Sequence, residues 1–169
     1  MVLRADVLDS AINDCFKKDR PMIYFSPKGK PLDQEMIEKF SIIKGVSIIC
    51  GHFEGIDQRI IDLHDIEEIS VGDYILSGGE IATIVFLDSL VRLLPNVLGN
   101  RDSKIIESFT DGLLEYPQYT KPNEFKGMKI PDILLSGNHK AIKEWQENQS
   151  LSLTKLRRPD LITKKKDKI

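Results

Sequence analysis

The run from Ser70 to Glu80, SVGDYILSGGE, constrains the fold of this 169-residue chain more than any other stretch. It holds three glycines between short apolar runs and a segment with the apolar spacing of a helix. Glycine lacks Cβ, so it allows the backbone to approach another group closely. The Ser-Gly-Gly-Glu junction also leaves N–H groups free at a helix start, where a polar ligand can bind. A tight strand-to-helix connection without a ligand is the alternative interpretation.

The same order of apolar run, glycine-bearing loop and helix occurs twice earlier in the chain. Residues 22–25 run into the turn-forming SPKG, and residues 46–50 run into GHFEGID, where Asp57 can cap a short helix. Helical spacing also predicts a first helix over 4–18, and Pro95 is expected to stop a helix over 80–94. Three alternations predict a parallel α/β sheet, with the three loops at the carboxyl edge where ligands bind.

The pattern ends after Gly99, and the stretch that follows, up to the proline-containing residues 116–122, indicates a linker. Beyond it, a brief apolar run covers 133–135, and Ser-Gly-Asn at 136–138 is expected to cap a helix that carries Trp145. The C-terminal end holds a local basic cluster, made of Lys155, Arg157, Arg158, Lys164, Lys165, Lys166 and Lys168. Contact with phosphate groups and a solvated terminus are both open interpretations of this cluster.

Composition narrows the function classes. Lys and Arg number 24 and Asp and Glu 26, so the net charge is −2 and nucleic acid would have to be bound by local basic clusters. Cys15 and Cys50 lie in apolar contexts without CxxC spacing, which argues against a disulfide or zinc site and fits a reducing cytoplasm. No apolar run approaches ~20 residues and no GxGxxG is present, so neither a membrane span nor a dinucleotide oxidoreductase is indicated.

Six motifs together resemble a known family. In chain order they are YFSPKG, CGHFEGIDQR, SVGDYILSGGE, GLLEYPQYTKP, LLSGNH and LRRPDL. They resemble the bacterial tRNA (guanine-N1)-methyltransferases over essentially the whole chain. The resemblance implies methylation of guanine N1 at position 37 of tRNA, next to the anticodon, with S-adenosylmethionine as methyl donor.

The resemblance also implies an architecture. It predicts a SPOUT-class α/β fold in which the three loops form a deep trefoil knot, an exception to the rule that chains do not knot. Residues 1–98 would form the knotted cofactor-binding domain, 99–116 the linker, and 117–169 a short helical tRNA-binding domain. The resemblance further implies a homodimer with composite active sites, in which Glu107 and the C-terminal domain of one subunit cover the knot of the other.

The resemblance assigns eleven residues of the three loops to the cofactor pocket. They are Phe25, Ser26, Pro27, Gly51, Glu54, Val71, Gly72, Tyr74, Leu76, Gly78 and Gly79. Recognition of adenine through backbone groups accounts for the glycines, because the adenine edge must meet N–H and C=O directly. Glu54 is the one carboxylate that the motif places near the cationic sulfonium, and its alternative role is as a charge that serves Arg59.

Two further residues are assigned to the chemistry by the resemblance. Glu107 occupies the position of the family's aspartate before Ser-Phe, where a carboxylate would accept the N1 proton of guanine. Arg92 matches the family's arginine near the end of the knot helix, where a guanidinium would stabilise charge on guanine O6. An ordinary surface arginine on an amphipathic helix is the alternative for Arg92.

The chain departs from the family pattern in several places. His52 stands in place of an arginine and Phe53 in place of a tyrosine, so a phosphate or hydroxyl contact is expected to be lost there. The sequence also aligns from just after a glycine-rich loop, so we expect the first strands to be absent and the chain alone to transfer no methyl group. The competing hypotheses are a catalytically inactive fragment that keeps cofactor or RNA binding, and a knotted methyltransferase that acts on another RNA.

Overall fold

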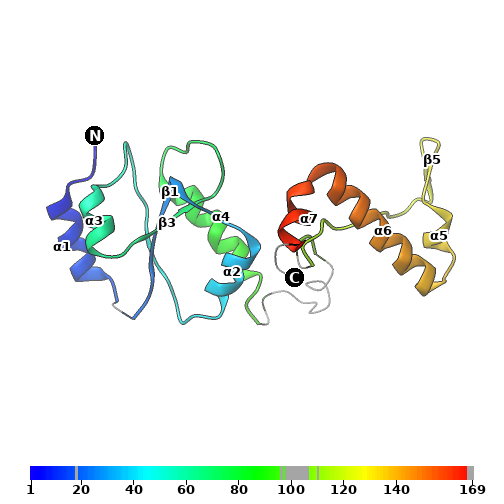
Figure 1. The fold of residues 1–169 in the computed structure, drawn as a ribbon, viewed down its shortest axis with the longest axis horizontal. Helices are drawn as coiled ribbons and strands as arrows, with labels where there is room; N and C mark the ends of the chain where they lie inside the picture. Colours follow the sequence, from blue (N-terminus) through cyan, green and yellow to red (C-terminus); the bar gives the residue numbers. More distant parts are fainter. Residues whose placement is uncertain (18, 96, 98–106, 110, 167–169) are drawn as a thin grey trace. The chain divides into compact units, whose positions relative to one another are not determined.

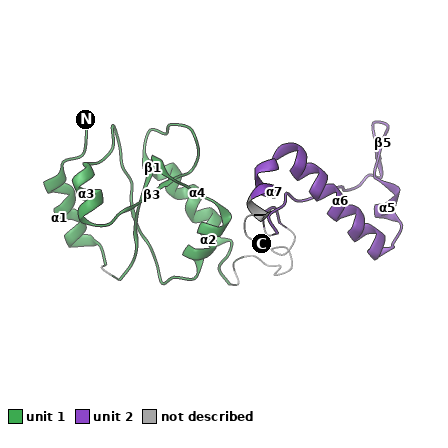
Figure 2. Cartoon of the chain, in the orientation of Figure 1, with its two compact units in different colours: residues 1–99 green, residues 100–169 purple. Residues whose placement is uncertain are grey.

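The computed structural model describes residues 1–17, 19–95, 97, 107–109 and 111–166. The chain forms two compact units, residues 1–99 (unit 1) and residues 100–169 (unit 2), which Figure 2 distinguishes by colour. None of the helices in the described ranges is long and apolar enough to cross a membrane.

Unit 1 contains a parallel sheet of three strands in the order β2-β1-β3 (Figure 1). The strands are β1 (Met22–Pro31), β2 (Ser47–Ile49) and β3 (Glu67–Ser70). Strand β1 is central, because Tyr24 pairs with Ile49 on one side and with Glu68 on the other. The parallel α/β sheet predicted from the alternating pattern is therefore confirmed.

Four helices cover the sheet, namely α1 (Ala5–Cys15), α2 (Gln34–Ser41), α3 (Gln58–Leu63) and α4 (Gly79–Val91). Because side chains alternate along a strand, Ile23 and Phe25 of β1 join the core beside α2 and α4, while Tyr24 joins the core beside α1 and α3. Phe86 of α4 is fully buried and packs edge-on against Phe40 of α2, with ring centroids 5.2 Å apart. Both faces are thus covered, as parallel sheets require.

The predicted helix boundaries were too generous at several ends. The first helix covers 5–15 instead of 4–18, and α4 ends at Val91 instead of reaching residue 94. Cys15, expected in an apolar environment, is exposed because it closes α1 on the side away from the core. Asp57 caps α3 as expected, since its side chain accepts a hydrogen bond from the Arg59 backbone N–H.

The SPKG segment is not a simple turn, as the sequence had indicated, but a break within β1. Phe25 and Lys30 both pair with Ile69, so residues 26–29 bulge out of the strand. At the end of the bulge, Gly29 lies close to β3, where an added Cβ would lie 2.3 Å from the backbone nitrogen of Ile69. The bulge turns Ser26 and Pro27 away from the ladder and makes them available to the neighbouring loops.

The described residues of unit 2 form a hairpin and three helices. The hairpin pairs β4 (Glu124–Phe125) with β5 (Met128–Lys129), and it is followed by α5 (Asp132–Leu135), α6 (His139–Arg157) and α7 (Pro159–Lys166). Asn138 caps α6 as predicted, because its side chain accepts a hydrogen bond from the Ala141 N–H. The hairpin was not predicted, since two-residue strands leave no periodic pattern.

One buried hydroxyl ties the described segment before α5 to helix α6. Thr154 is fully buried in the middle of unit 2. Its Oγ1 accepts a hydrogen bond from the Leu114 N–H at 2.9 Å and donates one to the Ser150 carbonyl at 2.6 Å. A buried N–H that loses its acceptor is costly, so this contact holds the chain around residue 114 on α6.

We expect Thr154→Val to destabilise unit 2 by about 1–3 kcal/mol, because the Leu114 N–H would lose its buried acceptor. Thr154→Ser retains the hydroxyl and should cost less, on the order of the 0.8 kcal/mol lost with one buried methyl group. Urea unfolding, followed by the fluorescence of the single tryptophan, Trp145, measures the loss of stability in both variants. Equal losses in the two variants would show that the hydroxyl contributes nothing.

Candidate functional site

The three glycine-bearing loops meet at one cavity of about 270 Å³ in unit 1. It lies at the carboxyl end of the parallel strands, the position expected for a ligand in an α/β sheet. All eleven residues predicted for the cofactor pocket line it: Phe25, Ser26, Pro27, Gly51, Glu54, Val71, Gly72, Tyr74, Leu76, Gly78 and Gly79. Residues as far apart in the sequence as Phe25 and Gly79 therefore line the same cavity.

Backbone contact joins the loop after β2 to the start of α4. The Gly79 N–H donates to the Gly51 carbonyl at 2.9 Å, and His52 forms an antiparallel bridge with Gly78. A Cβ at Gly79 would lie only 2.9 Å from the Cα of Cys50. The predicted close approach of backbone to another group is thus real, and part of it is an approach of one loop to another.

Tyr24 also lines the cavity and was missed in the sequence. A Cβ at Gly51 would lie 2.6 Å from Cε2 of the Tyr24 ring, and a Cβ at Gly55 would lie 3.1 Å from its hydroxyl. Burial, and to a lesser extent the negative charge of Glu68, raise the pKa of Tyr24. Its place as the first residue of YFSPKG was the available signal, but within an apolar run it resembled a core residue.

The third loop is compact although much of it is exposed. Gly72 has a φ of 151°, which L side chains rarely adopt, and the Tyr74 ring packs over it. The Tyr74 hydroxyl donates to the Val71 carbonyl at 3.0 Å. Tyr74 and Ile75 are exposed, so the cavity has an apolar rim that can cover a ring or an aliphatic chain.

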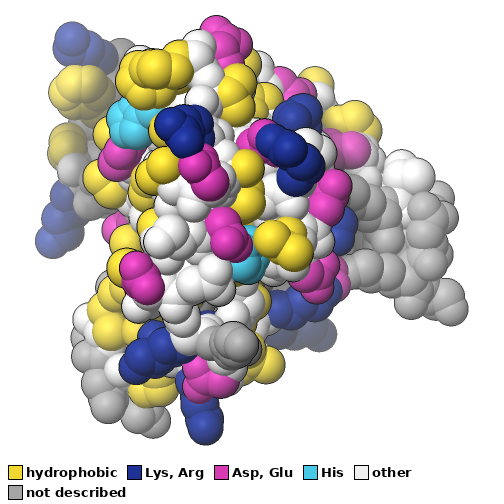
Figure 3. All heavy atoms as spheres, turned by 90° about the vertical axis from the view of Figure 1, so that its left-hand side faces the viewer, with side chains coloured by type: hydrophobic (Ala, Val, Ile, Leu, Met, Phe, Trp, Pro, Cys, Tyr) yellow, Lys and Arg dark blue, Asp and Glu magenta, His cyan; other side chains and the backbone are white. Residues whose placement is uncertain are grey.

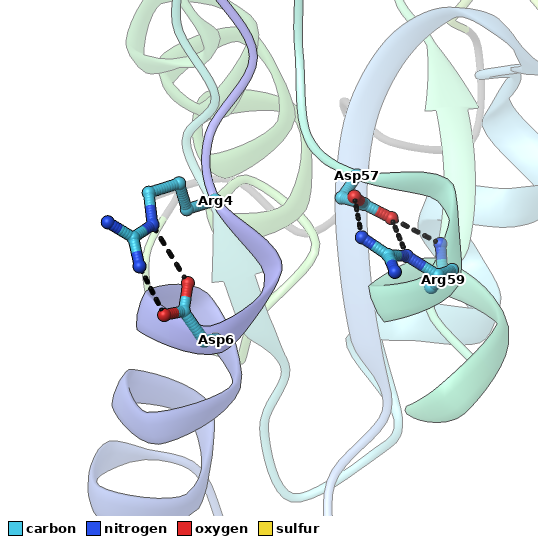
Figure 4. A network of polar contacts seen from close by, with 4 residues as sticks. All are labelled: Arg4, Asp6, Asp57 and Arg59. Carbon is cyan, nitrogen blue, oxygen red and sulfur yellow. Dashed lines mark hydrogen bonds and ion pairs between the residues drawn. The ribbon is translucent and has the colours of Figure 1, made fainter.

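Two carboxylates of the second loop have different surroundings. Glu54 lines the cavity, as predicted. Asp57 instead lies at the start of α3, where Arg59 holds it through two side-chain hydrogen bonds (Figure 4). Those bonds, together with the Arg59 backbone N–H, lower the pKa of Asp57 to about 2. Arg59 is thus paired within its own helix start, as Arg4 is with Asp6, and the structure does not assign Glu54 to it.

His52 makes a side-chain hydrogen bond at the rim of the cavity. Its Nε2 lies 2.6 Å from Oε1 of Glu80, the second residue of α4. The pKa of Glu80 is lowered, first by a backbone hydrogen bond at the helix start and then by His52. Neighbouring Phe53 is exposed with a φ of 59°. This hydrogen bond connects the second loop to α4.

Arg92 and Glu107, predicted to carry the chemistry, lie in different units. Arg92 caps the C-terminal end of α4 in unit 1, and its backbone N–H donates to the Asp88 carbonyl. Glu107 belongs to unit 2 and is half-buried. Their roles remain predictions.

Within the described residues, no three or more His, Cys, Asp or Glu side chains are grouped so that they could hold a metal ion. Cys50 is half-buried, with its Sγ 3.3 Å from the Thr83 hydroxyl.

The two units differ strongly in charge. Residues 1–99 carry 10 Lys and Arg against 16 Asp and Glu, a net charge of −6, whereas residues 100–169 carry 14 against 10, a net charge of +4. On the side of unit 1 that bears α1, basic side chains are interspersed with acidic and apolar ones (Figure 3). Electrostatic attraction for a polyanion is therefore concentrated in unit 2.

Comparison with known proteins decides the family. The family model described as "tRNA (Guanine-1)-methyltransferase TrmD" matches residues 1–164. The chain belongs to the tRNA (guanine-1)-methyltransferase family. The resemblance found in the six motifs is thereby confirmed.

Relatives of this methyltransferase family member extend over nearly all of its length. The tRNA (guanine-N(1)-)-methyltransferase of Pelagibacter ubique is 52% identical over 98% of this chain and 73% of its own length. The Bartonella tribocorum protein of the same name is 50% identical over 97% of this chain and 70% of its own length. The Brucella canis protein of the same name is 55% identical over 95% of this chain and 66% of its own length.

Within this methyltransferase fold, Gly79→Ala should be far more damaging than Gly78→Ala. The added Cβ at Gly79 meets the backbone of residues 50–51, which cannot move aside, so we expect a loss of about 1–3 kcal/mol in stability. At Gly78 the Cβ meets only the ends of the Glu80 and His52 side chains, which can rotate. Thermal unfolding and calorimetric titration with S-adenosylmethionine compare the two, and equal effects would contradict the backbone contact as the constraint.

Proposed function

We propose that this protein transfers a methyl group from S-adenosylmethionine to N1 of guanine at position 37 of tRNA. One observation carries the proposal: in a chain of this family, eleven predicted pocket residues from three separate loops line a single cavity. The SPOUT-class trefoil knot and the role of unit 2 as a tRNA-binding domain belong to the same proposal. The two cysteines of the chain lack the spacing of a disulfide or zinc site, which supports a location of the protein in the cytoplasm.

The cavity fits the cofactor in three respects. Gly51 and Gly79 line the cavity, and without a Cβ they allow Tyr24 and the second loop to pack closely, so that part of the wall is formed by backbone. The side chains of Leu76 and Tyr74 form an apolar part of the rim of the cavity. Glu54 supplies the carboxylate suited to a sulfonium cation. When bound, S-adenosylmethionine supplies an electrophilic methyl group.

The residues of the chain would serve the reaction by orientation, proton removal and charge stabilisation. The loops would hold the methyl group in line with guanine N1, which lowers the barrier by avoiding the entropy of encounter. As the N1–methyl bond forms and the sulfur–methyl bond breaks, the Glu107 carboxylate would accept the N1 proton. The Arg92 guanidinium would stabilise negative charge on O6.

Helix α4 supports the proposal of a homodimer. Ala82 and Phe86 on its inner face are buried in the core of unit 1. Beside the exposed Glu80 and Asp88, its outer face nevertheless carries five exposed apolar side chains, Ile81, Ile84, Val85, Leu87 and Val91. A cluster of exposed apolar side chains of this size is typical of a protein–protein interface. A second copy of the chain on this outer face would bury it and could bring Glu107 of one subunit to the cavity of the other.

The charge of unit 2 supports its role in holding tRNA. A net charge of +4 against −6 in unit 1 attracts the RNA backbone to the C-terminal half, where α6 ends in the basic side chains of Lys155 and Arg157. Phosphate neutralisation of this kind makes binding salt-dependent. The cavity of unit 1 would then act on the guanine that unit 2 helps to place.

The chemistry is tested with labelled S-adenosylmethionine and a tRNA that carries guanine at position 37. The chain is assayed alone and fused to the N-terminal segment of a relative. Glu107→Gln should lower the rate of methyl transfer by about 10²–10⁴-fold with unchanged cofactor affinity, because the carboxylate accepts the guanine N1 proton in the transition state and does not contact the cofactor. Glu107→Asp, which restores the family's residue, should retain or raise the rate.

Unchanged transfer in Glu107→Gln would remove Glu107 as the base. If both wild-type forms bind cofactor and tRNA but transfer no methyl group, the inactive, binding-only hypothesis would replace the enzyme.

The dimer is tested by placing a charge on the outer face of α4. Ile84→Glu, at a position 59% exposed in the single chain, should convert a dimer into a monomer, because the glutamate would be desolvated at the interface. Leu63→Glu changes an apolar residue on α3 that is 68% exposed, and it serves as the matched control. Light scattering reports the mass of each. A wild-type monomer, or dissociation by both variants alike, would contradict the proposed interface.

A further inference from the structure

The β4–β5 hairpin presents a small structured platform to solvent. Its two turn residues, Lys126 and Gly127, have φ values of 52° and 81°, the left-handed geometry of a tight two-residue turn. Phe125 pairs with Met128 across the turn. The Ile130 N–H donates to the Asn123 carbonyl at 2.9 Å and closes the base of the hairpin. Figure 1 shows the hairpin projecting from the helices of unit 2.

The platform combines apolar area with a cation. Residues directly opposite each other in an antiparallel pair lie on the same face, so Phe125 and Met128 adjoin. They are 57% and 68% exposed, although large apolar side chains are usually buried. The Lys126 ammonium lies 5.4 Å from the centroid of the Phe125 ring. The next pair along the hairpin, Glu124 and Lys129, forms its own ion pair at 3.8 Å.

This combination suits an unpaired nucleotide. A base stacks on an aromatic face, and a neighbouring cation contacts the phosphate. Two apolar side chains fall far short of the ~800 Å² per partner that stable protein interfaces bury. The +4 charge of unit 2 also favours a polyanionic occupant over an average protein surface.

We propose that Phe125, Lys126 and Met128 hold an unpaired nucleotide of the RNA substrate, with the base on the Phe125 ring and its phosphate near Lys126. The identity of that RNA as tRNA rests on the proposed function. The hairpin is then an RNA contact separate from the cavity in unit 1, and it selects single-stranded loops over continuous duplex because paired bases are not free to stack on it.

The test measures binding of the full chain to tRNA and to a fully paired RNA duplex at several salt concentrations. Phe125→Ala should weaken tRNA binding by about 5- to 100-fold, the usual effect of losing one stacked base. Its affinity for duplex, its salt slope and its calorimetric S-adenosylmethionine affinity should not change. Phe125→Trp should retain tRNA binding. Lys126→Gln should reduce the salt slope by about 0.7, the value for one single-strand phosphate contact.

Leu135→Ala removes an exposed apolar side chain of α5 in the same unit and is the matched control, with no loss expected. Wild-type tRNA affinity in Phe125→Ala, or an equal loss on duplex RNA, would overturn the hairpin proposal. If the wild type still methylates tRNA in those cases, the proposed function stands. A change of mass in light scattering of Phe125→Ala would show a protein contact instead. If the wild type binds no tRNA, both proposals fall.

Discussion

The close approach of Gly79 to the backbone of residues 50–51 is the constraint on which the candidate site depends. It fixes where α4 begins, because the Gly79 N–H is satisfied by the Gly51 carbonyl instead of by solvent. From that start, one face of α4 carries Ala82 and Phe86 into the core. The opposite, apolar face remains outside. A single glycine contact therefore positions the cavity wall, the core packing and the surface proposed for a second subunit.

The two units divide the physical requirements of acting on RNA. Unit 1 is acidic overall and supplies a cavity walled by backbone and apolar side chains, which suits a small cationic cofactor. Unit 2 is basic overall and presents the hairpin and the basic end of α6, which suit a polyanion. The acidic balance of unit 1 favours a sulfonium cation, and the basic balance of unit 2 favours phosphate groups. The proposed reaction needs both units because Arg92 and Glu107 are divided between them.

Much of unit 1 could be predicted because its signals are local and repeated. Apolar runs, glycine loops and helical spacing recur three times, and they predicted the parallel sheet and its ligand edge. Tyr24 was missed because a strand residue beside Phe25 looks like core, and only the glycines of another loop give its ring access to the cavity. The break in β1 was missed because it depends on how Ile69 pairs with both Phe25 and Lys30.

Local patterns in the sequence predicted the α/β class, the three loops, the caps at Asp57 and Asn138 and, through the six motifs, the family. These follow from backbone preferences and residue spacing, which act over a few positions. The three-dimensional structure was needed to show that Tyr24 lines the cavity, that His52 contacts Glu80, and that Thr154 accepts the Leu114 N–H. Those outcomes depend on which distant segments touch, and contacts between distant segments are set by packing instead of by local pattern.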